Sequence, residues 1–180
     1  MRASRPVPPP GAATVLVVMG VSGAGKTTIG EALAARLGWT FQEGDAFHPK
    51  ANIAKMASGH PLDDADRAPW LARVEAWISH QLAAGRSGII ACSALKQTYR
   101  HALVAGRDDV ILVYLHGGQD LIAERLKARH GHFMPPALLA SQIAALEVPD
   151  PQEKPIEVDI AQPVAAQVDD IVEALARRRG

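Results

Sequence analysis

Residues 15–28 read VLVVMGVSGAGKTT, and this stretch decides the fold of the chain. Its first five residues are apolar and rich in valine, which is typical of a buried parallel strand. The next residues have the spacing Gly, four residues, Gly-Lys-Thr, and a helical pattern follows them. A glycine-rich turn can spell this motif without function, but the strand before it and the helix after it favour a phosphate-binding loop.

Each part of this loop has a chemical use with a nucleotide. Its three glycines let the backbone curl, so that N–H groups point at phosphate oxygens near the positive end of the next helix. Lys26 is expected to reach the β- and γ-phosphates, and the Thr27 hydroxyl to bind Mg²⁺. The expected nucleotide-binding residues are Gly20, Val21, Ser22, Gly23, Ala24, Gly25, Lys26, Thr27 and Thr28.

Composition limits the class of protein. The chain has 180 residues, of which 48% are hydrophobic, and this fits one α/β domain over residues 14–180. Its formal net charge is zero, which argues against a nucleic-acid partner and for a small substrate. The single cysteine suits a cytoplasmic protein, and no apolar run is long enough to span a membrane. The proline-rich residues 1–13 are expected to be a disordered extension.

Hydrophobic periodicity predicts strands at 14–19, 39–42, 88–91, 110–115 and 156–160, with helices between them. This alternation indicates a three-layer α/β fold, a five-stranded parallel sheet covered by helices on both faces. Two helices are expected between the second and third strands. The first runs over 49–58, and the second is capped by Asp66, with Pro69 in its first turn. Such a helical insertion commonly covers the acceptor substrate in small kinases.

Side chains that can take part in catalysis follow two of the predicted strands, at the edge of the sheet where the loop lies. Glu43, Asp45 and His48 follow the second strand, and ligands of open parallel sheets bind outside the carboxyl ends of the strands. Cys92 and Ser93 follow the third strand. They lack an obvious base, so a packed strand end is favoured over a covalent nucleophile.

The remaining pattern is typical of a small kinase. The chain has no Asn-Lys-x-Asp motif of the kind that recognises guanine, and its third and fourth strands do not end in an acid. Arg125 and Arg129 lie four residues apart on one helix, which leads into a Gly/His/Phe loop at 130–134 that suits a mobile lid. These arginines can cover the adenine and approach the phosphates, although exposed helix charges are the alternative.

The chain resembles the gluconate kinases (gluconokinases), a family of small phosphate-loop kinases. The resemblance covers about residues 15–160, whereas residues 1–13 lie outside it. Ala24 and Thr27 stand where serine is often expected, but Thr27 keeps the hydroxyl. The matching stretches are 20–30 (GVSGAGKTTIG), 43–49 (EGDAFHP), 52–56 (NIAKM), 59–71 (GHPLDDADRAPWL), 92–96 (CSALK), 99–100 (YR), 132–133 (HF), 141–142 (SQ), 146–147 (LE), Pro149 and Glu153.

This resemblance implies transfer of a phosphoryl group from ATP to the 6-hydroxyl of D-gluconate, with Mg²⁺, and a homodimer. In such a reaction Lys26 and Mg²⁺ neutralise the phosphates. Asp45 is our choice to orient the acceptor hydroxyl and to take its proton. Glu43 either holds Mg²⁺ through water or is only a surface acid.

An acidic, hydroxyl-rich acceptor needs cations and hydrogen-bonding groups around it. We expect only some of the available side chains to touch it, because each has another explanation. Lys55 can lie on a solvated helix, Arg67 can pair with a neighbouring acid, and His48 can be a turn residue. The expected acceptor-binding residues are Asp45, His48, Lys55, Arg67, Lys96, Arg100 and His132.

Two other functions stay open at this point. One is a kinase of similar build with another acceptor, such as shikimate or a nucleoside monophosphate. The other is a regulator that binds ATP without turnover, which the presence of both Lys26 and Asp45 disfavours.

Overall fold

The computed structural model describes residues 11–128 and 136–180, so most of the expected N-terminal extension lies outside the described residues. The described chain forms one five-stranded sheet in the order β2-β3-β1-β4-β5. Every neighbouring pair of strands is parallel. The strands are β1 (Val15–Met19), β2 (Thr40–Glu43), β3 (Gly88–Ala91), β4 (Val110–His116) and β5 (Ile156–Asp159).

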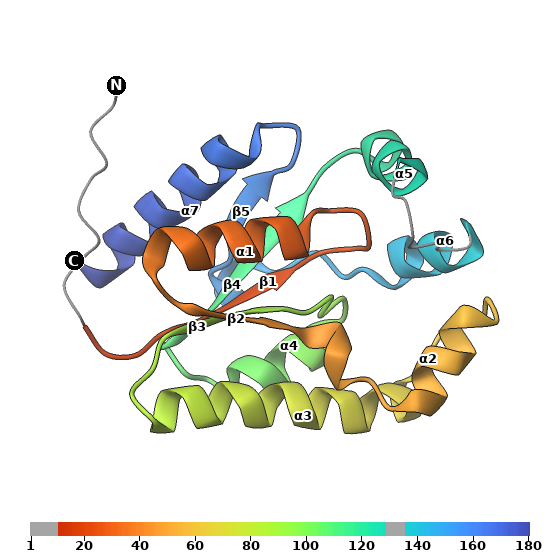
Figure 1. Cartoon of the computed structure of the whole chain (residues 1–180), viewed down its shortest axis with the longest axis horizontal. Helices are drawn as coiled ribbons and strands as arrows, with labels where there is room; N and C mark the ends of the chain where they lie inside the picture. Colours follow the sequence, from red (N-terminus) through yellow and green to blue (C-terminus); the bar gives the residue numbers. More distant parts are fainter. Residues whose placement is uncertain (1–10, 129–135) are drawn as a thin grey trace.

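Helices cover both faces of this sheet, which confirms the predicted three-layer α/β fold. Figure 1 shows α1 and α7 on one face, α3 and α4 on the other, and α2, α5 and α6 near the carboxyl ends of the strands. None of these described helices is both long and apolar enough to cross a membrane. The helices are α1 (Lys26–Leu37), α2 (Lys50–Ala57), α3 (Asp64–Ala83), α4 (Gln97–Val104), α5 (Gln119–Lys127), α6 (Pro136–Ala145) and α7 (Val164–Arg179), with short 3₁₀ helices η1 (Gly44–Phe47) and η2 (Pro151–Glu153).

The central strand β1 explains why its sequence is apolar throughout. All five of its residues are buried, because helices cover both faces of the sheet. Successive side chains point to opposite faces, so Leu16 packs with Leu33 of α1, whereas Val17 belongs to the cluster that contains Val74 of α3. The phosphate-loop motif thus begins at the end of a strand that is buried along its whole length.

The start of α3 differs from the prediction. Asp63, not Asp66, is the N-cap, and the two residues form a reciprocal capping box. The backbone N–H of Asp66 donates to Asp63 Oδ1 at 2.7 Å, and that of Asp63 donates to Asp66 Oδ2 at 3.0 Å. The helix begins at Asp64, before the residue that was predicted to cap it, and Pro69 lies inside it rather than in its first turn.

Candidate active site

The loop between β1 and α1 lies at the carboxyl edge of the sheet. Gly23 and Gly25 have φ values of 85° and 95°, a left-handed conformation that favours glycine. Gly25 directly precedes α1, so the N–H groups of the first helical turn face the loop. The side chain of Lys26 folds back over this loop, where Nζ donates to the carbonyl oxygens of Gly20 at 2.9 Å and Val21 at 3.2 Å. A cation in this position lies where phosphates are expected.

Thr27 and Glu43 meet beside the loop. The strand β2 ends at Glu43, one residue later than predicted, and the Glu43 carboxylate accepts a hydrogen bond from the Thr27 hydroxyl. A hydroxyl and a carboxylate are oxygen donors of the kind that Mg²⁺ prefers. Among the described residues, no group of three His, Cys, Asp or Glu side chains could hold a metal ion. The pair fits Mg²⁺ because this ion usually keeps several waters and binds substrate phosphates.

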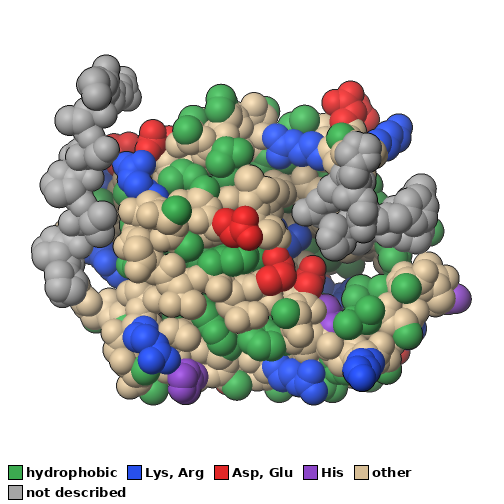
Figure 2. Space-filling model, viewed as in Figure 1, with side chains coloured by type: hydrophobic (Ala, Val, Ile, Leu, Met, Phe, Trp, Pro, Cys, Tyr) green, Lys and Arg blue, Asp and Glu red, His purple; other side chains and the backbone are tan. Residues whose placement is uncertain are grey.

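Charged side chains are unevenly distributed over one face of the molecule. In the space-filling view acidic side chains gather near the middle of the face, beside a hollow (Figure 2). Lysine and arginine side chains lie mostly toward the rim of the same view.

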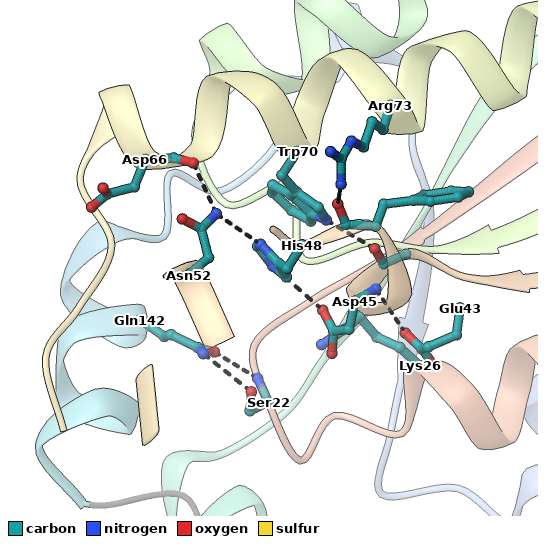
Figure 3. A network of polar contacts seen from close by, with 12 residues as sticks. Ser22, Lys26, Glu43, Asp45, His48, Asn52, Asp66, Trp70, Arg73 and Gln142 are labelled. Atoms are coloured by element: carbon teal, nitrogen blue, oxygen red, sulfur yellow. Dashed lines mark hydrogen bonds and ion pairs between the residues drawn. The ribbon is translucent and has the colours of Figure 1, made fainter. Parts of the chain in front are cut away.

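Asp45 lies in η1, two residues beyond Glu43, and points toward the open side of the loop (Figure 3). Its side chain is 71% exposed, so a substrate hydroxyl can reach the carboxylate. The ring of His48 lies beside it, with Nε2 4.0 Å from Asp45 Oδ1. Asp45 is therefore the open acid next to the phosphate loop, whereas Glu43 is engaged with Thr27.

The ring of His48 is fixed by contacts with two other side chains, which a residue that only forms a turn would not require. Its ring stacks on Trp70 with the ring centroids 4.4 Å apart, and Asn52 Nδ2 lies 3.2 Å from His48 Nδ1. Burial lowers the pKa of His48, the Asp45 carboxylate opposes this shift, and the Arg67 charge adds to it. The predominantly neutral ring can accept or donate a hydrogen bond to a polar substrate.

Two residues that fix this region were not assigned a role from the sequence. Trp70 of α3 donates from Nε1 to the carbonyl oxygen of Gly44 at 2.9 Å, which ties η1 to α3. Asn52 of α2 donates to the carbonyl oxygen of Asp66 at 2.9 Å and also contacts His48. Both residues lie in stretches that match the gluconokinases, but only the tertiary contacts reveal their part.

Two of the predicted cations come together around one tyrosine. Arg67 Nη1 donates to the Tyr99 hydroxyl at 3.1 Å, and Lys96 Nζ pairs with Asp64 Oδ1 at 2.9 Å. The Tyr99 hydroxyl donates to the same Asp64 oxygen. We call the residues His48, Arg67, Lys96 and Tyr99, with Asp64, the acceptor wall, after the prediction from the sequence that His48, Arg67 and Lys96 bind the acceptor.

The other two predicted cations have different surroundings. Lys55 is partly exposed and pairs with Asp66 Oδ2 at 2.6 Å, so it is linked to the α3 capping box. Arg100 is 1% exposed and pairs with the buried Glu153 at 2.7 Å, and it also donates to two backbone carbonyls. Arg100 is therefore withdrawn from the expected acceptor site, because its guanidinium group is buried and engaged in a structural ion pair.

A small pocket lies beside the phosphate loop, between α1, α5 and α7, and has a volume of about 210 Å³. Arg125 of α5 lies in its wall and donates from Nη2 to the carbonyl oxygen of Ile160 at 2.6 Å. Arg129, His132 and the expected lid at 130–134 lie outside the described residues. The pocket is lined by Gly23, Ala24, Gly25, Thr28, Ile29, Arg125, Val164 and Gln167.

The phosphate loop also receives a side chain from α6. The backbone N–H of Ser22 donates to Gln142 Oε1 at 2.8 Å, and Gln142 Nε2 donates to the Ser22 hydroxyl at 3.1 Å (Figure 3). These residues are 120 positions apart in the sequence. The match of 141–142 to the gluconokinases is the sequence signal that could have pointed to this contact.

Cys92 is a packed strand end, as expected. It is fully buried directly after β3, and burial is the main cause that raises the pKa of its thiol to about 12. The thiolate that nucleophilic catalysis needs is therefore scarce at neutral pH.

Comparisons with known proteins agree with this geometry. A family model described as shikimate kinase matches residues 22–176. A gluconokinase from Gluconobacter oxydans (strain 621H) is 53% identical over 143 residues, which cover 79% of this chain and 80% of that protein.

Solved structures give the same picture. A sugar kinase from Janibacter sp. HTCC2649 has a TM-score of 0.86 at 45% identity, covering 91% of this chain and 95% of that chain. A gluconokinase from Sinorhizobium meliloti 1021 has a TM-score of 0.82 at 44% identity, covering 92% and 93%. A shikimate kinase from Bacteroides thetaiotaomicron, at 17% identity and a TM-score of 0.62 over 91% and 98%, shares the fold alone. By sequence and structure together, the chain belongs to the gluconokinase family of small phosphate-loop kinases.

Proposed function

We propose that this protein transfers the γ-phosphoryl group of ATP to the 6-hydroxyl of D-gluconate, giving 6-phospho-D-gluconate and ADP. The observation that carries the proposal is the position of Asp45, an exposed acid that lies between the phosphate loop and His48 (Figure 3). Membership of the gluconokinase family supports D-gluconate as the acceptor.

The side chains divide the work between charge neutralisation and positioning. Lys26 would neutralise the β- and γ-phosphates. The Thr27 hydroxyl would bind Mg²⁺ directly, and the Glu43 carboxylate would hold the same ion through a water molecule. Asp45 would orient the acceptor hydroxyl and accept its proton. Bound Mg²⁺ would spread the negative charge that develops during transfer.

The rest of the site would bind the two substrates. Arg125 would lie over the adenine, and Arg129 would approach the phosphates. On the acceptor side, His48, Arg67 and Lys96 are our proposed contacts. His132 is a further proposed contact. Lys55 is also proposed, but its ammonium group already pairs with Asp66, so we expect it to contribute less to acceptor binding.

A related kinase with another acceptor is less well supported. The matching family model is described as shikimate kinase, but the shikimate kinase from Bacteroides thetaiotaomicron is only 17% identical to this chain. The gluconokinases are much more similar, at 53% and 44%. A homodimer and a cytoplasmic location are further parts of the proposal, and sedimentation of the purified protein tests the first.

The deciding experiment is a coupled assay of ADP release with Mg-ATP. D-Gluconate, other sugar acids, shikimate and nucleoside monophosphates are compared with a blank that contains only ATP. We expect strong release with D-gluconate alone. Release with another acceptor, and none with D-gluconate, would overturn the proposed acceptor while leaving the kinase fold intact.

A further inference from the structure

Tyr99 is a buried residue whose polar and aromatic parts both face charged groups. It is 7% exposed and lies in α4, which packs against α3. Its hydroxyl accepts from Arg67 at 3.1 Å and donates to Asp64. The proposed phosphoryl transfer gives this residue no direct task.

The ring of Tyr99 lies near two cations, Arg67, which also donates to its hydroxyl, and Lys96, which pairs with the Asp64 carboxylate that the hydroxyl contacts. The Arg67 guanidinium carbon and Lys96 Nζ each lie 5.6 Å from the ring centroid. At this distance the ring attracts a cation. One side chain therefore restrains two cations that come from different elements, α3 and the loop before α4.

This cluster is linked to the proposed catalytic acid, Asp45, through Trp70 and His48. Arg67 lies three residues before Trp70 in α3, so the two side chains share one side of that helix. His48 stacks on Trp70, and its Nε2 lies 4.0 Å from Asp45 Oδ1. Arg67 is therefore on the side of α3 that carries the neighbour of Asp45. D-Gluconate carries its reacting hydroxyl and its carboxylate at opposite ends of one carbon chain, so a substrate that starts at Asp45 needs cations farther along the wall.

We propose that Tyr99 is a positioning residue for recognition of the acceptor's carboxylate: its hydroxyl and ring hold Arg67 and Lys96 in place. This inference rests on the proposed function. Asp64, whose side chain is 68% exposed, balances the charge of Lys96 and completes the arrangement. Tyr99 acts through the two cations and does not need to touch the reacting atoms.

The test is Tyr99→Phe, which keeps the ring and removes only the hydroxyl. We expect the KM for D-gluconate to rise about tenfold, the effect of one lost hydrogen bond to a charged group. The kcat and the KM for ATP should change less than about twofold, since the phosphate side is untouched. Tyr114→Phe is the matched control, because Tyr114 is the other tyrosine and is also buried.

A neutral analogue separates positioning from a general structural role. D-Glucitol carries a hydroxymethyl group in place of the carboxylate, and its inhibition constant against D-gluconate is measured for the unaltered protein and for Tyr99→Phe. The proposal predicts no change for D-glucitol in Tyr99→Phe. An unchanged KM for D-gluconate, or an equal loss for D-gluconate and D-glucitol, would overturn it.

A double-mutant cycle tests whether Tyr99 affects D-gluconate binding through Arg67. If Tyr99 acts through Arg67, the Tyr99→Phe change should add little to the KM in an Arg67→Lys background. Full additivity contradicts that route. Should Tyr99→Phe fail to fold, Arg67→Lys alone must still raise the KM for D-gluconate selectively, because it keeps the charge and loses the planar donor group. Absence of turnover by the unaltered protein would instead count against the proposed function itself.

Discussion

The proposed phosphate side and the proposed acceptor side of this site are built in different ways. On the phosphate side, one short segment supplies the loop glycines, the helix start, Lys26 and Thr27. On the acceptor side, the acceptor wall is assembled from η1, α3, α4 and their flanking residues. Its contacts join side chains that are far apart in the sequence, such as Arg67 and Tyr99, which are 32 positions apart. The first is a local backbone structure, and the second is a network of tertiary contacts.

This difference predicts different consequences of substitution. A substitution on the phosphate side removes one group that stabilises negative charge on the phosphates, so it should reduce kcat with little effect on the stability of the fold. A change on the acceptor side disturbs several contacts at once, so it should alter stability or the KM for the acceptor. Four substitutions test this division, from the largest expected effect to the smallest.

Asp45→Asn tests the residue that lies between the two sides. It should reduce kcat by about 1,000-fold, because a general base typically contributes about 100- to 10,000-fold. ATP binding, measured by calorimetry, should be unchanged. Asp170→Asn, on the exposed face of α7, is the control. Near-normal turnover would remove Asp45 from the mechanism.

Lys26→Ala tests the phosphate side alone. A loss of about 100- to 1,000-fold in kcat is expected, as for other single groups that stabilise developing charge. The melting temperature should stay close to that of the unaltered protein. Lys127→Ala, at an exposed position at the end of α5, is the control. An active Lys26→Ala protein would contradict the assignment of the loop.

Gly44→Ala tests the backbone of the acceptor side. A Cβ at this position would lie 2.2 Å from the carbonyl oxygen of Ala91, so η1 must move away from β3. Such overpacking costs about 1–3 kcal/mol, or roughly 2–12 °C in melting temperature. Gly118→Ala is the control, because no atom lies within 4 Å of the position that its Cβ would take. Equal melting temperatures for the two variants would refute the predicted clash.

His48→Phe tests the smallest effect, the pH dependence of stability. Because the folded pKa of His48 is below its ordinary value of 6.5, the unfolded chain binds the proton first as the pH falls. The stability that neutral His48 contributes is therefore present above about pH 6.5 and is lost at lower pH. Thermal melting at about pH 7.5 and 5.5 should show a smaller difference for His48→Phe than for the unaltered protein. An equal difference for the two proteins would contradict this contribution of His48.

The phosphate side could be predicted well from the sequence because its signals are local. The strand, the glycine spacing and the helix start all lie within residues 15–28, and periodicity also gave the five strands of the sheet. The predicted cap of α3 was wrong because Asp63 and Asp66 both satisfy the local rule for an N-cap, and in the structure each side chain accepts from the other's backbone.

The acceptor side could be predicted only in part, since charge is visible in a sequence and burial is not. Arg100 resembled a substrate-binding cation until its burial against Glu153, 53 positions away, showed an ion pair. Gln142 and Trp70 gave no local pattern for their contacts with Ser22 and Gly44. Residues that act across the fold need the tertiary structure.

The stack of His48 on Trp70 also makes the acceptor side visible to fluorescence. Trp70 is buried and is one of three tryptophans in the chain, and its indole lies face to face with the imidazole at 4.4 Å. A protonated imidazole at this distance quenches indole emission, whereas a neutral one does so much less. Protonation of His48, or a ligand that binds beside Asp45, is therefore expected to change the fluorescence of Trp70, which needs no added label.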